Sequence, residues 1–377
     1  MSGDSGASSY VWPEWLPLRK DLKGQSPYGA PQLPLEVKLN TNENPFSLSP
    51  DLVAKLSAAI SGSAKNFNRY PDRDAIELRT ELAKYLNSTT GMNLGVDQIW
   101  AANGSNEIIQ TLFLAFAGAG VNSLGFTPSY SMHPLISKVS GVSWRDGGRR
   151  PDFSLDLAKA QSDIAEIRPA LTFITTPNNP TGSSINLSEL ETLAQATAAV
   201  AGLLVIDEAY AEFSENDSAV TLIASYPNVV VIRTMSKAFA FAGARMGYLV
   251  ARAEIVEAML LVRLPYHLSS LTQAAAEVAL DFKDQLLGTV SRLIASRKSV
   301  AAQLEEMGLM VAPSDANFIL FSGFKLPAPQ LWQLLLDKGV LIRDVGLLGH
   351  LRMTIGNDAE NQKFIAALQE ILNGESQ

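Results

Sequence analysis

The sequence predicts an α/β protein, with a mainly parallel sheet in a large domain and a smaller α+β domain after it. Short apolar runs alternate with helical patterns over roughly 95–250, which is typical of a mainly parallel sheet. Three of the runs, 203–206, 229–232 and 247–250, suit strands that are buried on both faces of such a sheet. At 377 residues the chain exceeds the size at which a single core keeps growing, so we expect two domains.

An N-terminal arm is expected over residues 1–40, because residues 10–35 contain five prolines and no sustained periodicity. Within it, Leu35–Leu39 is predicted to be a short strand. The large domain is then expected over 41–280. It begins with a helix at Ser49–Ile60, in which Ser49 is the cap and the following proline takes the first helical position.

The rest of the large domain is predicted from further apolar patterns. An amphipathic helix is expected at Arg73–Asn87 and another helix at Leu187–Ala201. Further strands are expected at Ile99–Ala102, Ser123–Phe126 and Leu171–Thr175. The small α+β domain is expected over 281–377, with helices and three strand-like runs: Phe318–Phe321, Val340–Ile342 and Leu351–Ile355.

Composition excludes several classes of function. A net charge of −8 argues against a nucleic-acid partner, because neutralising phosphates needs a basic surface. The absence of cysteine removes disulfides, thiolate nucleophiles and cysteine zinc sites, and it fits a reducing compartment. The three histidines have no metal-ligand spacing, so no metal is expected. Without a signal-peptide pattern or a run of about 20 apolar residues, we expect a soluble cytoplasmic protein that does not enter the membrane.

Polar residues close two of the apolar runs. Asp207 follows the first run, and Thr234, Ser236 and Lys237 follow the second. In an open α/β sheet, ligands bind in the crevice beyond the carboxyl ends of the strands. We therefore expect an acid, two hydroxyls and a lysine to face one crevice.

A second polar segment, Gly104-Ser105-Asn106, lies between a predicted strand and a predicted helix. A glycine and small polar residues at such a turn leave backbone N–H groups free at a helix N-terminus, which is a ready phosphate site. Taken alone, however, an ordinary helix cap is the favoured explanation of the segment.

The combined chemistry of these residues points to pyridoxal phosphate. Lys237 can form an imine with an aldehyde, provided that burial and neighbouring positive charge keep it deprotonated. Asp207 can hold a proton on a heteroaromatic nitrogen, which makes a pyridine ring an electron sink. Arg245 can give a forked pair of hydrogen bonds to a phosphate. Each residue alone has a plainer explanation, as a solvated charge or a helix cap, but their joint occurrence at strand ends favours the cofactor.

The sequence resembles the fold-type-I pyridoxal-phosphate aminotransferases, through Asn178–Gly182, Asp207–Tyr210, Ser236–Phe239 and the arginine eight residues after Lys237. Within that superfamily it is similar to the histidinol-phosphate aminotransferase branch. The resemblance implies a seven-stranded, mainly parallel sheet between helices. Further matching motifs are Asn42–Pro45, Arg69–Asp72, Asn103–Glu107, Phe126–Tyr130 and Leu351–Gly356.

The resemblance also implies a role for each matching residue. Lys237 would bind the cofactor covalently and then carry the proton between it and the substrate α-carbon. Asp207 would pair with the pyridine nitrogen, and Tyr130 would stack on the ring. Tyr210 and Asn179 would contact the ring oxygen. The phosphate would be held by Gly104, Ser105, Asn106, Thr234, Ser236 and Arg245. Tyr70 would reach the phosphate of the neighbouring subunit's cofactor, which implies a homodimer.

The substrate is predicted from the residues that would meet its anionic end. In this interpretation Arg352 binds that end, and Arg343 joins it when the end is a phosphate dianion. An alternative for Arg343 is an ion pair with Asp344 or another surface acid. The other residues that we expect to bind substrate are Tyr28, Asn42 and Tyr266.

The expected reaction is reversible amino transfer between L-histidinol phosphate and 2-oxoglutarate, giving imidazole acetol phosphate and L-glutamate, in L-histidine biosynthesis. Three alternatives remain open at this point. An aromatic amino acid aminotransferase would share every cofactor residue. A decarboxylase acting on a phosphorylated amino acid would use the same cofactor set. A non-enzymatic binding module that kept the fold is disfavoured by the intact Lys237 and Asp207.

Overall fold

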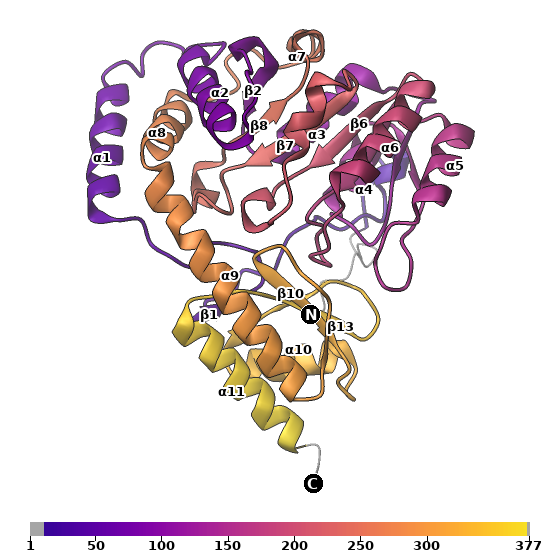
Figure 1. Ribbon diagram of the computed structural model, residues 1–377, viewed down its shortest axis with the longest axis vertical. Coiled ribbons are helices and arrows are strands. Elements are labelled where there is room, and N and C mark those ends of the chain that lie inside the picture. Colours follow the sequence, from indigo (N-terminus) through magenta and orange to yellow (C-terminus); the bar gives the residue numbers. More distant parts are fainter. Residues whose placement is uncertain (1–10, 375–377) are drawn as a thin grey trace.

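The computed structural model describes residues 11–374 of the chain. Residues 1–10 of the expected arm therefore lie outside the described residues. A seven-stranded sheet forms the centre of the large domain, with helices on both sides (Figure 1). In spatial order its strands are β2 (Ile99–Ala102), β8 (Gly247–Val250), β7 (Val229–Thr234), β6 (Leu203–Asp207), β5 (Leu171–Thr175), β3 (Asn122–Gly125) and β4 (Ser143–Asp146).

The sheet is mainly parallel, as predicted. Strands β4, β3, β5, β6 and β7 pair in parallel, whereas β8 is antiparallel to both β7 and β2. The expectation that 247–250 joins a parallel set is therefore wrong for that run. The connection from β7 to β8 contains only a 3-10 turn at Ala242–Ala244, and parallel neighbours need a crossover helix. The short connection instead carries Ser236, Lys237 and Arg245 into the region above the strand ends.

Both faces of the sheet are buried. Along β7, Val229 and Val231 belong to one apolar cluster, and Val230 and Ile232 belong to another on the opposite face. The helices that enclose these clusters are α1 (Pro50–Ala64), α2 (Ile76–Thr90), α3 (Ser105–Phe116), α4 (Met132–Val139), α5 (Leu157–Ile167), α6 (Leu187–Ala199), α7 (Ala253–Leu260) and α8 (Ser270–Asp281). Continuous apolar runs are what a strand covered on both faces requires.

Two helix starts show how local chemistry sets the boundaries. The hydroxyl of Ser49 accepts from the N–H of Leu52 (3.3 Å), so α1 begins where its cap predicts. Helix α2 begins at Ile76, three residues later than expected. The Asp72 carboxylate accepts from the N–H of Ile76 (2.9 Å), and Ala75 adopts a left-handed φ of 45°, which keeps the preceding residues out of the helix.

The small domain contains a four-stranded antiparallel sheet, reached from the large domain through the long helix α9 (Lys283–Glu306) (Figure 1). Its strands, in spatial order, are β12 (Arg343–Asp344), β13 (His350–Thr354), β10 (Phe318–Ser322) and β9 (Met310–Val311). The helices α10 (Ala328–Asp337) and α11 (Asp358–Gly374) complete it. The register of this sheet sets Arg343 opposite Arg352.

The segment before α1 ties the two domains together. Strand β1 (Val37–Lys38), within the predicted strand Leu35–Leu39, pairs in parallel with β11 (Val340–Leu341) of the small domain. The chain then passes between the domains before α1 begins. This segment therefore brings residues 39–44 to the boundary between the two sheets.

Candidate active site

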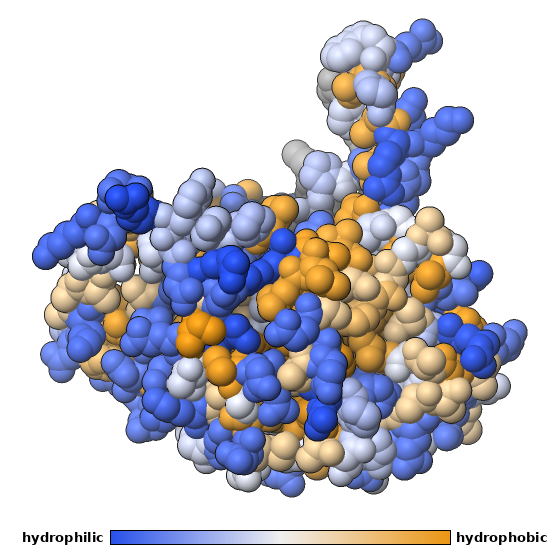
Figure 2. Space-filling model, turned by 90° about the horizontal axis from the view of Figure 1, so that it is seen from above, coloured by the Kyte–Doolittle hydropathy of each residue, from blue (hydrophilic) through white to orange (hydrophobic). Residues whose placement is uncertain are grey.

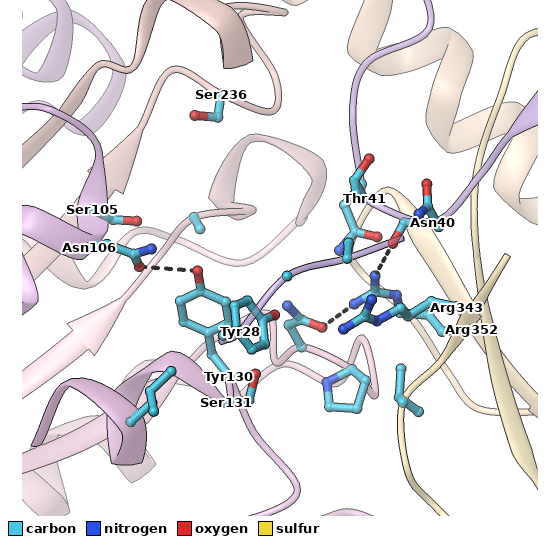
Figure 3. A pocket seen from close by; sticks show the side chains of 18 of the residues that line it. Tyr28, Asn40, Thr41, Ser105, Asn106, Tyr130, Ser131, Ser236, Arg343 and Arg352 are labelled. Atoms are coloured by element: carbon cyan, nitrogen blue, oxygen red, sulfur yellow. Dashed lines mark hydrogen bonds between the residues drawn. The ribbon is translucent and has the colours of Figure 1, made fainter. Parts of the chain in front are cut away.

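A cavity of about 1340 Å³ lies above the carboxyl ends of β5, β6 and β7 and receives residues from both domains (Figure 3). It collects most of the residues singled out in the sequence. Its lining includes Tyr28, Asn42, Ser105, Asn106, Tyr130, Asn179, Asp207, Tyr210, Thr234, Ser236, Lys237, Arg245, Arg343 and Arg352. Gly104 directly precedes the first residue of α3 at the wall of the cavity.

Lys237 lies after the end of β7, with its ammonium nitrogen in the cavity. Nζ donates to the backbone carbonyl of Thr41 (2.9 Å). Burial lowers the pKa of Lys237 to about 8, and the positive charge of Arg352 contributes in the same direction. A neutral amine is therefore accessible near neutral pH, as nucleophilic attack and proton transfer both require.

Asp207 ends β6 and is only 2% exposed. One carboxylate oxygen meets Nε2 of His133 (3.1 Å), and the other accepts from the N–H of Ala209 (3.2 Å). His133 lies on α4, and its ring packs against Phe173. Sequence reasoning did not assign His133 to the site, although its position three residues after Tyr130 was a usable signal.

One end of the cavity has the donors of an anion site. Thr234 donates its hydroxyl proton to Oγ of Ser236 (2.9 Å), and α3 begins at Ser105 beside them. Arg245 donates to the carbonyl of Ala242 (3.2 Å) and forms no ion pair within residues 11–374. A Cβ added at Gly104 would lie 2.6 Å from Nη2 of Arg245, so the guanidinium lies close to this helix N-terminus.

Aromatic and amide side chains line the middle of the cavity. Tyr130 donates to Oδ1 of Asn106 (3.1 Å). The Tyr210 oxygen receives a hydrogen bond from Nδ2 of Asn42 (2.9 Å), and Nδ2 of Asn179 faces it at 3.5 Å. Burial raises the pKa of Tyr210 to about 12, so its hydroxyl keeps its proton at neutral pH.

Two arginines occupy the opposite end, side by side in Figure 3. Arg352 donates from Nη1 to Asn179 and from Nη2 to the carbonyl of Asn40 (2.8 Å). Burial lowers the pKa of Arg352 to about 10, which leaves it charged at neutral pH. Nε of Arg352 and Nη1 of Arg343 are buried and have no hydrogen-bond partner among the described residues. Buried donors of this kind are costly unless a ligand satisfies them.

Two predicted site residues lie away from this cavity. Tyr70 is 79% exposed, and its ring stacks on that of Tyr266 at 4.3 Å with an interplanar angle of 14°. Neither lines the cavity of its own chain. Tyr266 therefore does not meet substrate in its own chain's cavity, and its role toward substrate stays a prediction.

The residues that line the cavity have the chemical types that binding of pyridoxal phosphate requires. An amine of lowered pKa, a buried carboxylate and an aromatic ring lie between a cationic anion site and a pair of arginines. Within residues 11–374 no cluster of three or more histidine or acidic side chains could hold a metal ion. No helix in that part of the chain is long and apolar enough to cross a membrane.

Comparisons with known proteins identify the family. The family model for aminotransferase class I and II matches residues 36–368. A histidinol-phosphate aminotransferase of Mycolicibacterium smegmatis is 54% identical over 363 residues, covering 96% of this chain and 95% of the relative.

Two solved structures share the fold of this chain. That of the histidinol-phosphate aminotransferase from Clostridium acetobutylicum has a TM-score of 0.80 at 26% identity, covering 90% of this chain and 99% of that one. That of the Sinorhizobium meliloti enzyme, in complex with pyridoxal-5'-phosphate, has a TM-score of 0.79 at 24% identity, covering 90% and 92% of the two chains. The chain therefore belongs to the class I and II aminotransferases, a family of enzymes that depend on pyridoxal 5'-phosphate.

Proposed function

We propose that this enzyme is a histidinol-phosphate aminotransferase. It would transfer the amino group of L-histidinol phosphate to 2-oxoglutarate, reversibly, giving imidazole acetol phosphate and L-glutamate in L-histidine biosynthesis. The 54% identity to a relative of that name over nearly the whole chain supports this substrate.

The observation that carries the substrate assignment is the pair Arg343 and Arg352. They lie opposite each other on β12 and β13, and neither forms an ion pair with an acid in the described part of the chain. The alternative partner for Arg343, Asp344, instead accepts from the N–H of Gly346 (2.9 Å). Two guanidiniums with unused donors match a phosphate dianion, whereas a single carboxylate needs only one of them.

At the reacting end, the cofactor supplies an electron sink that stabilises negative charge on the substrate α-carbon. Lys237, with its pKa of about 8, would remove the α-proton as a neutral amine and return it as an ammonium. Asp207, held by His133, would keep a proton on the pyridine nitrogen. Tyr130 would support the ring. The cofactor phosphate would be held by Gly104, Ser105, Asn106, Thr234, Ser236 and Arg245.

The substrate side would include Tyr28, from the arm, and the two arginines. Asn42 is a poor candidate for direct substrate contact. Its amide is already used, because it donates to Tyr210 and accepts from Thr354. Its role toward substrate stays a prediction, and these hydrogen bonds support a second role for it.

A homodimer is part of the proposal. The segments around Tyr70 and Tyr266 lie side by side, joined by the ring stack and by hydrogen bonds from Arg263 to Arg73 and Asp74. Phe67, Leu261 and Leu264 in these segments are 54%, 85% and 75% exposed. On the face of the molecule that Figure 2 shows, apolar patches interrupt the charged surface. An apolar surface of this kind is typical of a contact between subunits. In a dimer, Tyr70 and Tyr266 would reach the partner's cavity.

The domain division and the location are proposed as well. We propose an arm over 1–40, a large domain over 41–280 and a small domain over 281–377. The separate seven-stranded and four-stranded sheets support the last two. The pairing of β1 with β11 supports contact between the arm and the small domain. A cytoplasmic location is consistent with the cysteine-free sequence.

The variant Arg343→Gln tests the substrate assignment. It removes one guanidinium at the phosphate end and leaves Arg352, so kcat/KM for histidinol phosphate should fall about 100-fold. The value for phenylalanine should change less than about threefold. Equal losses for the two amino donors would contradict the assignment of Arg343 to the phosphate.

A further inference from the structure

We propose that Asn42 and Thr354 are positioning residues that make the Tyr210 hydroxyl an obligate hydrogen-bond donor to the bound cofactor. Neither of them would touch the reacting atoms. They would act through Tyr210, by fixing which partner of each hydrogen bond gives the proton.

Thr354 fixes the orientation of the Asn42 amide. The backbone N–H of Asn42 donates to Oγ1 of Thr354 (2.9 Å), so Oγ1 is the acceptor in that bond. The hydroxyl has one proton, and it goes to Oδ1 of Asn42 (3.0 Å). The oxygen of the amide therefore faces Thr354, and its NH₂ group faces the other way.

That NH₂ group meets Tyr210. Nδ2 of Asn42 lies 2.9 Å from the phenolic oxygen and can only donate to it. Asn179 is oriented by the same logic, because its Oδ1 accepts from Arg352, which has no acceptor to offer. Its Nδ2 faces the same phenolic oxygen at 3.5 Å.

The Tyr210 oxygen is thus surrounded by donors. Its own proton has no acceptor among these neighbours, and Tyr210 lines the cavity, so the proton is directed to a ligand there. Tyr210 is 4% exposed and burial keeps its phenol protonated, so this proton is present throughout the physiological pH range. A donor so arranged stabilises the deprotonated form of the phenolic oxygen on the cofactor ring and lowers the pH at which the bound cofactor titrates.

The positioning groups are rigidly placed. Asn42 is 2% exposed and has a left-handed φ of 56°, a conformation that asparagine tolerates better than most residues. Its carbonyl accepts from Nδ2 of Asn317 (3.1 Å) on the small-domain side. Thr354 ends β13, whereas Tyr210 follows β6, so this chain of hydrogen bonds joins the small domain to the large one.

The test is a pH titration of the visible absorbance of the substrate-free holoenzyme. Asn42→Asp keeps the shape but replaces the donor with a carboxylate that accepts the Tyr210 proton. Thr354→Val removes the hydroxyl that orients the amide at nearly constant volume. Thr354→Ser retains that hydroxyl and is the matched control. Cofactor content and thermal unfolding are measured for each variant, so that only folded, loaded protein is compared.

We expect the midpoint of the absorbance titration to rise by about one pH unit or more in Asn42→Asp and by about half a pH unit in Thr354→Val. Thr354→Ser should titrate like the wild type. If either loaded variant titrates within about 0.2 units of the wild type, Tyr210 does not depend on these residues and the inference is wrong. The inference depends on the family's cofactor and not on the proposed substrate. If the titrations contradict the role of Asn42 and Thr354, the histidinol-phosphate assignment is unaffected. If the substrate assignment is wrong, the role of Asn42 and Thr354 is likewise unaffected.

Discussion

Arg343 and Arg352 face each other across β12 and β13, and each retains a buried nitrogen without a hydrogen-bond partner within residues 11–374. Two like charges so close repel each other, and burial adds to the cost. Asn179 and the carbonyl of Asn40 satisfy part of Arg352 only. The arrangement is therefore expected to be completed by an anion.

Arg352 should serve both half-reactions, because it lies deeper in the cavity than Arg343 and is only 6% exposed. We expect Arg352→Gln to reduce kcat/KM for both histidinol phosphate and 2-oxoglutarate by about 100-fold or more. Steady-state kinetics with each substrate varied in turn measures this. A loss confined to histidinol phosphate would show that another residue binds the carboxylate of 2-oxoglutarate.

The lowered pKa of Lys237 predicts a pH dependence for the cofactor-free protein. Burial and Arg352 destabilise the ammonium, so Nζ should lose its proton at about pH 8 instead of above pH 10. The rate at which an amine-reactive reagent modifies Lys237 should therefore rise about tenfold per pH unit below pH 8 and level off above it. Mass spectrometry of the modified peptide gives the rate. An increase that continues to pH 10 would contradict the assigned pKa.

His133 holds the carboxylate of Asp207 and is not among the residues that line the cavity. Replacing it with phenylalanine keeps an aromatic ring against Phe173 but removes the hydrogen bond at 3.1 Å. We expect His133→Phe to lower kcat by about tenfold, because Asp207 would hold the pyridine proton less firmly. His133→Gln, which can still donate to Asp207, is the control and should recover part of the activity. Wild-type activity in His133→Phe together with a loss in His133→Gln would mean that the ring matters and the hydrogen bond does not.

Gly104 and Gly141 form a matched pair for the anion site. Both have a positive φ, 82° and 76°, so alanine strains the backbone at each position. A Cβ at Gly104 would meet Nη2 of Arg245 at 2.6 Å, whereas one at Gly141 would have no neighbour within 4 Å. Gly104→Ala should weaken binding of pyridoxal phosphate about tenfold, and Gly141→Ala should affect stability alone. A fluorescence titration measures the affinity of each variant for pyridoxal phosphate. Equal affinities in the two variants would show that phosphate binding by Arg245 does not depend on its close approach to Gly104.

The sequence predicts strands well where continuous apolar residues end abruptly. The runs at β2, β5 and β8 have the expected bounds. Strand β4 was not predicted, because Ser143–Asp146 is an exposed edge strand without an apolar run. Helix α4 was also not predicted, because it is short and contains Pro134 in its first turn.

In the candidate site too, some residues could be predicted from local sequence patterns and others could not. Asp207, Ser236 and Lys237 were found because they lie at strand ends, which topology brings to one edge of the sheet. Thr354 and Asn42 come together across 312 residues, and no local pattern encodes that contact. The carbonyls of Asn40 and Thr41 also could not be found, because every residue has one and only the fold determines which of them faces Arg352 or Lys237.

The most direct test of the central proposal is the specificity constant of the wild-type enzyme for histidinol phosphate beside that for phenylalanine, with 2-oxoglutarate as the acceptor. The arginine pair predicts a preference of about 100-fold or more for histidinol phosphate, equal to about 2.7 kcal/mol of differential transition-state binding. An equal or greater constant for phenylalanine would contradict the proposal. The cofactor site would be unaffected by that result, but Arg343 would need a different role.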